Sequence, residues 1–267
     1  MTNWIFLRGL TRDSRHWGRF LQTFRERVPD ADVHALDLPG NGLLNRLRSP
    51  ATVTQMTDFC RTELIRQRAS PPYHVLAMSL GAMVALDWAA THPNELRGCV
   101  LINTSVRTYS PFHQRLKPGS YAPLLGLALF GGTDRQWESA ILRLTSTRPD
   151  AGAAVVDQWT DYRRERPVSR ANALRQLLAA ARFRSPIAAP GPRLLLLASG
   201  RDALVSAGCS RSLAAAWSTA FAEHPGAGHD LPLDDGAWVA EQVAAWLGRP
   251  GDSGVACCAS TSSQISV

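Results

Sequence analysis

Short apolar runs along the chain alternate with longer stretches in which apolar residues recur every three or four positions. A short run bounded by Gly, Pro or polar residues is typical of a buried strand, and the longer spacing is typical of an amphipathic helix. Six segments contain such a run and predict strands: "WIFLRGL", "DVHALDLPGNG", "YHVLAMS", "RGCVLINTS", "PRLLLLASGRDALV" and "TAFAEHPGAGHD".

Stretches with helical spacing separate these runs. They include "DSRHWGRFLQTFRERV", "TVTQMTDFCRTELIRQRA", "GAMVALDWAATHP" and the last periodic segment, "GAWVAEQVAAWLG". Short strands that alternate with helices predict an α/β fold, in which a parallel sheet is covered on both faces.

The alternation is interrupted once, after Val106. Residues 107–190, which we call the cap segment, contain several helical stretches and no strand pattern. We therefore expect residues 1–106 and 191–248 to form the core and the cap segment to be a helical insertion over the C-terminal ends of the strands, where open α/β sheets bind ligands. The Gly-, Ser- and Thr-rich residues 249–267 are predicted to be a disordered tail.

Length and composition narrow the class of protein. A chain of 267 residues with 45% apolar content is long enough for one large domain with a sizeable core. No apolar run approaches the roughly 20 residues of a membrane helix, and the first residues do not resemble a signal peptide. The five cysteines have neither zinc nor CxxC spacing, which predicts a reduced cytoplasmic protein without a metal site; they are Cys60, Cys99, Cys209, Cys257 and Cys258.

The net charge of +7 belongs to the cap segment. Thirteen Lys and Arg and six Asp and Glu lie between Arg107 and Arg184, so the rest of the chain is about neutral. The pattern lacks the interleaved aromatic and basic residues of a nucleic-acid module, so we expect no nucleic-acid partner. Three interpretations remain: a solvated helical surface, a site for an anionic substrate, and docking of an acidic carrier protein.

Three polar residues follow predicted strands in an order that carries chemistry. Ser79 follows "HVLAM", Asp202 follows "LLLLASGR" and His229 follows "TAFAEHPGAG". A serine becomes a nucleophile when a histidine takes its proton and a carboxylate orients that histidine. Small residues must flank such a serine because the turn from strand to helix is tight. The usual pattern has glycine at both flanks, and here Ala77 and Gly81 occupy them.

Each of these residues also has an ordinary interpretation. Ser79 fits a plain strand–helix junction, Asp202 a turn-capping residue and His229 a surface loop. His224 is the second candidate for the base. The stretch "GNGLLN" after a strand suggests a dinucleotide loop, but its third glycine is missing, so we expect no cofactor.

Four landmarks together resemble the α/β-hydrolase superfamily over nearly all of residues 3–248. In order, they are "FLRGL", "LDLPGNG", "AMSLGA" and "GRDALV…GAGHDLPL". Among its branches, the chain is most similar to small cap-bearing carboxylesterases, including the pimeloyl-carrier-protein methyl ester esterase type. The family usually opens with an antiparallel hairpin, for which this chain has no room, so we expect about six parallel strands.

The resemblance implies a serine hydrolase that cleaves a carboxylic ester with Ser79, His229 and Asp202. The backbone N–H groups of Leu10 and Leu80 would form the oxyanion hole. Where the family usually has His-Gly in the oxyanion turn, this chain has Arg8-Gly9. The candidates for lining or gating the pocket are Arg8, Gly9, His16 and Trp137.

Apolar cap residues are expected to furnish a substrate wall or, equally, to be the packing core of the cap; they are Leu124, Leu125, Leu127, Leu129, Phe130 and Trp137. Other activities of the same fold stay open: a lyase, a C–C hydrolase, a haloperoxidase-type enzyme, or a binding protein without catalysis.

Overall fold

The sheet has six parallel strands in the order β2-β1-β3-β4-β5-β6, which confirms the predicted class and strand number. The structure, a computed structural model, describes residues 1–148 and 152–249, without the side chains of residues 127–130. Except for Arg249, the tail predicted to be disordered therefore lies outside the described residues. The strands are β1 (Thr2–Leu7), β2 (Ala31–Leu36), β3 (Tyr73–Met78), β4 (Leu96–Ile102), β5 (Arg193–Ser199) and β6 (Ala220–His224).

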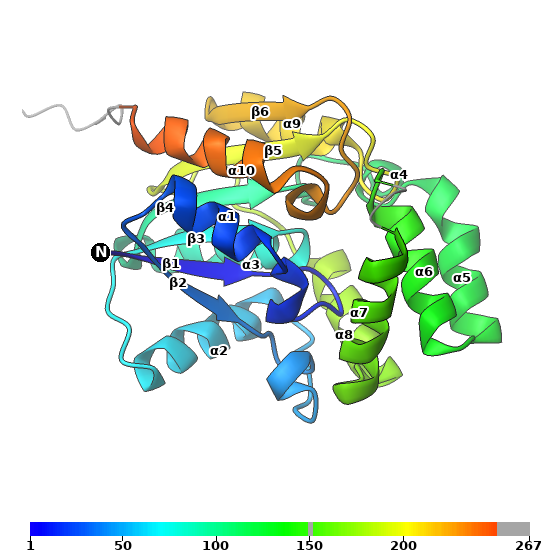
Figure 1. The fold of residues 1–267 in the computed structure, drawn as a ribbon. Helices are drawn as coiled ribbons and strands as arrows, with labels where there is room; N and C mark the ends of the chain where they lie inside the picture. The colour runs from blue at the N-terminus through cyan, green and yellow to red at the C-terminus, as the bar shows by residue number, and fades with distance from the viewer. Residues whose placement is uncertain (149–151, 250–267) are drawn as a thin grey trace, which may run out of the picture.

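Helices cover both faces of the sheet (Figure 1). On one face lie α1 (Phe20–Arg27) and α10 (Leu231–Leu247), and on the other lie α2 (Val53–Arg66), α3 (Leu80–Thr91) and α9 (Ala207–Trp217). The two cores follow from the alternation of side chains along a strand. In β1, Trp4 and Phe6 pack toward α1 and α10, whereas Ile5 and Leu7 pack toward α2 and α3.

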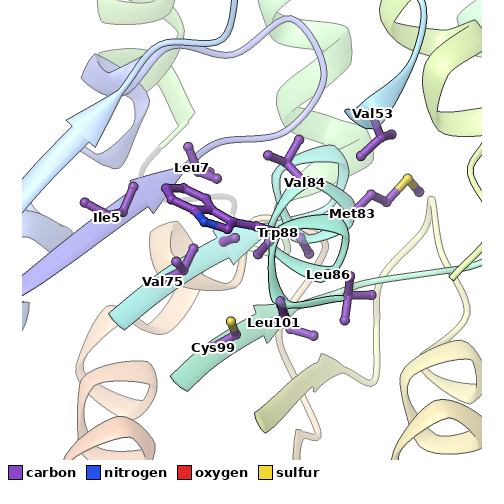
Figure 2. Packing of buried hydrophobic residues seen from close by; sticks show 14 of the residues in the cluster. Ile5, Leu7, Val53, Val75, Met83, Val84, Leu86, Trp88, Cys99 and Leu101 are labelled. Atoms are coloured by element: carbon purple, nitrogen blue, oxygen red, sulfur yellow. The ribbon is translucent and has the colours of Figure 1, made fainter. Parts of the chain in front are cut away.

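Helix α3 is the central packing element behind the sheet. Its residues from Leu80 to Ala89 are all buried, and all but Asp87 are apolar or glycine. Figure 2 shows the indole of Trp88 lying beside β1 and β3, near Leu7 and Val75. This burial fixes the N-terminus of α3, and the serine that precedes it, against the ends of the strands.

Between β4 and β5, the described part of the cap segment contains helices and no strand. These helices are α4 (Phe112–Arg115), α5 (Tyr121–Phe130), α6 (Asp134–Thr145), α7 (Gly152–Glu165) and α8 (Arg170–Arg182). They stand beyond the arrowheads of the strands, at the C-terminal edge of the sheet (Figure 1). No helix in the described residues is long and apolar enough to cross a membrane.

Candidate active site

Ser79 sits on a sharp turn between β3 and α3. Its backbone has φ 54° and ψ −115°, a conformation that is costly for any residue with a side chain. The Ser79 N–H donates to the carbonyl of Ile102 at 3.0 Å, which ties the turn to the end of β4. Strain of this kind persists only where the surrounding structure enforces it, and here the buried strand and helix on either side do so.

The small residues around Ser79 have separate physical reasons. A Cβ on Gly81 would lie 2.5 Å from the carbonyl oxygen of Leu7 and 2.7 Å from that of Arg8, so only glycine lets α3 approach β1 this closely. Ala77 is fully buried in β3 and does not have a positive φ. Alanine therefore fits the position at which the family pattern usually has glycine.

Asp202 and His229 form a buried acid–base pair. His229 Nδ1 lies 2.6 Å from Asp202 Oδ2. The other carboxylate oxygen accepts the backbone N–H groups of Leu204 at 2.7 Å and Val205 at 2.9 Å. Because these donors hold one oxygen, the carboxylate presents the other to the imidazole in a fixed direction, and Nε2 is left to act on another group.

The surroundings of His229 set its pKa. Burial by itself lowers the pKa, but the charge of Asp202, its hydrogen bond and the charge of Asp230 outweigh burial and raise the pKa above its ordinary value. Arg8 opposes this rise. The imidazole is therefore a stronger base than a free histidine.

Ser79 and His229 are linked indirectly, through hydrogen bonds to the consecutive residues Ile102 and Asn103. No hydrogen bond joins the Ser79 hydroxyl to the imidazole, although both residues belong to the described part of the chain. Asn103 follows Ile102, the acceptor of the Ser79 N–H, and its Nδ2 donates to the His229 carbonyl at 2.8 Å. Catalytic hydrogen bonds often close only when substrate is bound.

The two expected oxyanion donors belong to the loop after β1 and to the first turn of α3. Gly9 packs on the serine, since a Cβ there would lie 3.1 Å from Ser79 Cβ. The next residue, Leu10, has an N–H without an acceptor among the described residues. Leu80 is the first residue of α3, where an N–H has no partner within the helix.

Arg8 is buried in an ion pair that the sequence did not suggest. Its Nη1 and Nη2 donate to the two oxygens of Asp230 at 3.1 and 2.5 Å, and both side chains are 3% exposed. The guanidinium carbon also lies 4.8 Å from the ring centre of Trp17. Burial alone would raise the pKa of Asp230, but Arg8 lowers it below its usual range, so the pair is charged.

Asp234 and Asp230 attach the histidine loop to the cap segment, a role that sequence reasoning also missed. The Asp234 carboxylate accepts the N–H of Gly228 at 2.7 Å and of Thr147 at 2.9 Å. The Asp230 N–H donates to the carbonyl of Thr145, the last residue of α6, at 2.6 Å. The available sequence signal was the position of these two carboxylates, one and five residues after His229.

His224, the second candidate for the base, supports a turn instead. Its Nδ1 accepts the backbone N–H groups of Gly226 at 3.1 Å and Ala227 at 2.9 Å, and its Nε2 lies 3.2 Å from Asp235. Both ring nitrogens are therefore engaged away from Ser79, and His224 is not the base in this arrangement.

A cavity of about 290 Å³ lies between the cap helices and the loop after β1, the loop that holds the expected oxyanion donor Leu10. His16 and Trp137 line it, whereas Arg8 and Gly9 do not. Its wall is completed by Thr11, Arg12, Asp13, Gly131, Gly132, Glu138, Ile141, Tyr162, Arg163, Arg166, Val168, Arg170 and Ala173.

Of the three expected wall residues whose side chains the structure describes, one lines this cavity. Leu124 and Leu125 of α5 do not line it, and Leu125 is 57% exposed. Helix α5 stands on the outer side of the cap (Figure 1). The side chains of Leu127, Leu129 and Phe130 lie outside what the structure describes, so Trp137 is the one member of the predicted set that is seen at the cavity.

His16 is a structural residue of the cavity wall. Its Nδ1 lies 3.0 Å from Asp13 Oδ1 and its Nε2 lies 3.1 Å from Arg12. Burial and the nearby Arg12 charge lower its pKa to about 4, so it is neutral at physiological pH. Among the described residues, no group of three His, Cys, Asp or Glu side chains could hold a metal ion.

Comparison with known proteins agrees with this architecture. Residues 4–242 match the model of a family described as the alpha/beta hydrolase family. A segment of 92 residues is 33% identical to a pimeloyl-[acyl-carrier protein] methyl ester esterase of Chromobacterium violaceum. That match spans 34% of each chain, so it covers about a third of this relative's length.

Solved structures share the fold at low identity. An esterase from Thermogutta terrifontis has a TM-score of 0.70 at 18% identity, covering 92% of this chain and 89% of that chain. The enol-lactonase of Burkholderia xenovorans LB400 has a TM-score of 0.73 at 15% identity, with 93% and 92% covered.

Proposed function

The chain belongs to the alpha/beta hydrolase family, and from that premise we propose that it is a serine hydrolase that cleaves a carboxylic ester through an acyl-enzyme. One observation carries the proposal: a nucleophile-type turn at Ser79 occurs in the same molecule as a buried 2.6 Å pair between Asp202 and His229. A strained serine at a helix N-terminus has no need of this pair for stability, whereas catalysis needs both.

In the proposed reaction, Ser79 is the nucleophile and His229 is the general base. His229 Nε2 accepts the Ser79 proton as the hydroxyl oxygen attacks the ester carbonyl. The negative charge of Asp202 stabilises the imidazolium that forms, and its hydrogen bond holds the ring in one tautomer. The proton then passes to the departing alcohol, and the acyl group stays on Ser79.

Two backbone donors stabilise the charge that develops on the carbonyl oxygen. In this proposal, the N–H groups of Leu10 and Leu80 point at the oxyanion, and each such donor contributes roughly 3 kcal/mol to the transition state. Water then attacks the acyl-enzyme, with His229 as base, and the acid product leaves.

The test uses a fluorescent phosphonate that reacts with activated serines. The wild type should be labelled at one site, Ser79→Ala should not be labelled, and Asp202→Asn should be labelled more slowly because the wrong tautomer is favoured. Mass spectrometry of the labelled peptide locates the adduct. Equal labelling of wild type and Ser79→Ala would overturn the assignment of the nucleophile.

The reaction class is tested with a substrate panel. Esters of increasing acyl length, thioesters and C–C substrates separate an esterase from a lyase, a C–C hydrolase or a haloperoxidase-type enzyme. Turnover of a non-ester alone would contradict the ester assignment. The absence of both labelling and turnover would support the remaining alternative, a binding protein without catalysis.

Docking of an acidic carrier protein on the cap segment stays a second proposal, supported by the charge of that segment and by the carrier-linked substrate in the name of the Chromobacterium relative. Charge reversal at Arg163, Arg164 and Arg166 should then slow turnover of carrier-bound esters and spare free esters that carry no charge. Equal slowing of both would contradict it. The cytoplasmic location stays a prediction.

A further inference from the structure

Four arginines gather at one cavity of the cap. Arg12, Arg163, Arg166 and Arg170 line it, together with two carboxylates, Asp13 and Glu138. The cavity is about 290 Å³ in volume, which is the size of a small organic ligand. Since His16 has a pKa of about 4, it contributes no positive charge at neutral pH.

Both carboxylates are already paired. Glu138 accepts from Arg12 at 2.6 Å and lies 3.6 Å from Arg163. Asp13 pairs with Arg15, which lies outside the cavity wall, at 2.8 Å.

The other two arginines of the cavity wall are Arg166 and Arg170. Within the described residues, neither side chain has an ion pair or a hydrogen bond, although the Arg166 backbone N–H donates to Tyr162. Arg12 also has one buried nitrogen, Nη2, without a hydrogen-bond partner. The cavity therefore has an uncompensated positive wall and a buried donor that is unused.

The remaining wall is apolar and aromatic. Trp137, Ile141, Tyr162 and Val168 line the same space. A guanidinium from Arg163 lies 4.8 Å from the ring centre of Trp137, which holds that ring in place. An apolar chain that ends in an oxyanion matches this combination of surfaces better than a neutral chain or a bare ion does.

One edge of the cavity lies in the loop after β1, next to Leu10. Thr11 lines it and directly follows Leu10, and the Thr11 N–H is held by Gln176 of α8 at 2.9 Å. Gly9, which packs on Ser79, is two residues from Thr11, so the cavity edge lies within about 8 Å of Gly9 along the backbone. A short acyl chain on Ser79 can span that distance.

We propose that this cavity is an anion subsite, in which Arg166 and Arg170 bind a terminal carboxylate or phosphate of the ester substrate while the ester carbonyl lies at Ser79. The proposal rests on the proposed function, which supplies the ester. It names the substrate class as esters with an apolar chain and an oxyanion at the far end.

The kinetic test compares two methyl esters of equal chain length, monomethyl adipate and methyl hexanoate. Wild type should favour monomethyl adipate in kcat/KM by about tenfold or more, since a charge-assisted contact is worth at least that factor. In Arg166→Ala/Arg170→Ala, the preference should fall to about twofold or less, because kcat/KM falls much more for monomethyl adipate than for methyl hexanoate. Arg182→Ala, an exposed change at the other end of α8, should keep the wild-type preference.

The binding test uses a variant that lacks the proposed nucleophile, so that binding is measured without turnover. Adipate should bind Ser79→Ala, as measured by calorimetry, and should bind about tenfold or more weakly when Arg166 and Arg170 are also alanine. Inorganic phosphate and a monoalkyl phosphate, titrated in the same way, tell whether carboxylate or phosphate is preferred.

The outcomes separate the two proposals. Ester turnover without any preference for monomethyl adipate, or adipate binding that ignores both arginines, would overturn the subsite and spare the hydrolase. Arginine-dependent adipate binding without ester turnover would support the subsite and overturn the hydrolase.

Discussion

Arg8 and Asp230 form a two-bonded ion pair, 97% removed from solvent, that joins the loop after β1 to the residue beside the catalytic histidine candidate. Arg8 is followed directly by Gly9, which contacts Ser79. Asp230 follows His229 and bonds the end of α6 through its N–H. One buried contact thus relates the positions of the loop after β1, of His229 and of the cap segment.

Removing one member of this pair should lower the free energy of unfolding more than removing both. Arg8→Met leaves a buried carboxylate without a partner and should lower the free energy of unfolding by about 3 to 5 kcal/mol. Arg8→Met/Asp230→Asn leaves no buried charge and should recover part of that loss. Urea unfolding of the two single variants and the double variant measures the coupling, and strictly additive losses would show that the pair does not act as a unit.

The pH dependence of ester turnover should report the charge of Asp230. In the proposed mechanism neutral His229 is the base. Its pKa is raised, so the midpoint of the acidic limb of kcat/KM should lie above pH 6.5. Asp230→Asn removes a negative charge beside the imidazolium, so the pKa falls and the acidic limb moves to lower pH. Asp58→Asn, an exposed change on α2, should leave the limb in place. A limb that moves upward in Asp230→Asn would contradict the electrostatic argument.

Asn103 should prove to be a positioning residue for His229. It is buried, has φ 48°, and bonds Ser199 as well as the His229 carbonyl. Asn103→Ala leaves these groups unpaired, which should cost about 2 kcal/mol in stability. We expect kcat to fall while KM changes little, because the base and not the substrate wall is displaced. Asn94→Ala, at an exposed site, is the control. Loss of stability with kcat unchanged would make Asn103 a purely structural residue.

The fold was predictable because its signals are local. Six apolar runs and the helices between them are visible without tertiary information, and the cap segment was visible as an interruption of that alternation. Ser79, Asp202 and His229 were found because each follows a strand, and parallel strands end at one edge of the sheet.

The ion pair and the cavity were not predictable, because they depend on contacts between distant segments. Arg8 and Asp230 lie 222 residues apart, and no periodicity relates them. The positive charge of the cap segment was evident, but which arginines are left unpaired depends on where Glu138 and Asp134 fall on α6. Hydropathy does not tell which side of a cap faces the core, and Leu124 and Leu125 of α5 do not line the cavity.

Gly81 should tolerate no side chain, whereas Ala77 should not need to be glycine. In Gly81→Ala, the new Cβ meets the backbone of β1, so α3 must move; we expect about 1 to 3 kcal/mol of destabilisation. Because Leu80 and Ser79 move with α3, turnover should fall by about 100-fold. Ala77→Gly restores the usual pattern but should lose about 1 kcal/mol and gain no activity. Higher turnover in Ala77→Gly would show that alanine is a compromise at this site.

His74 should make the fold sensitive to acid. It stacks on Trp4 with ring centres 4.7 Å apart, and burial, together with Arg97 and Arg193, lowers its pKa to about 4. Since the unfolded chain binds a proton near pH 6.5 and the folded chain does not, stability is full above pH 6.5 and is lost as pH falls toward 4. Between pH 6.5 and 4.5, this one group should account for about 2 to 3 kcal/mol. In His74→Phe, the ring stack is kept and that loss should be absent, so its free energy of unfolding should fall less steeply with acid than that of the wild type. Parallel curves for the two proteins would contradict the assignment.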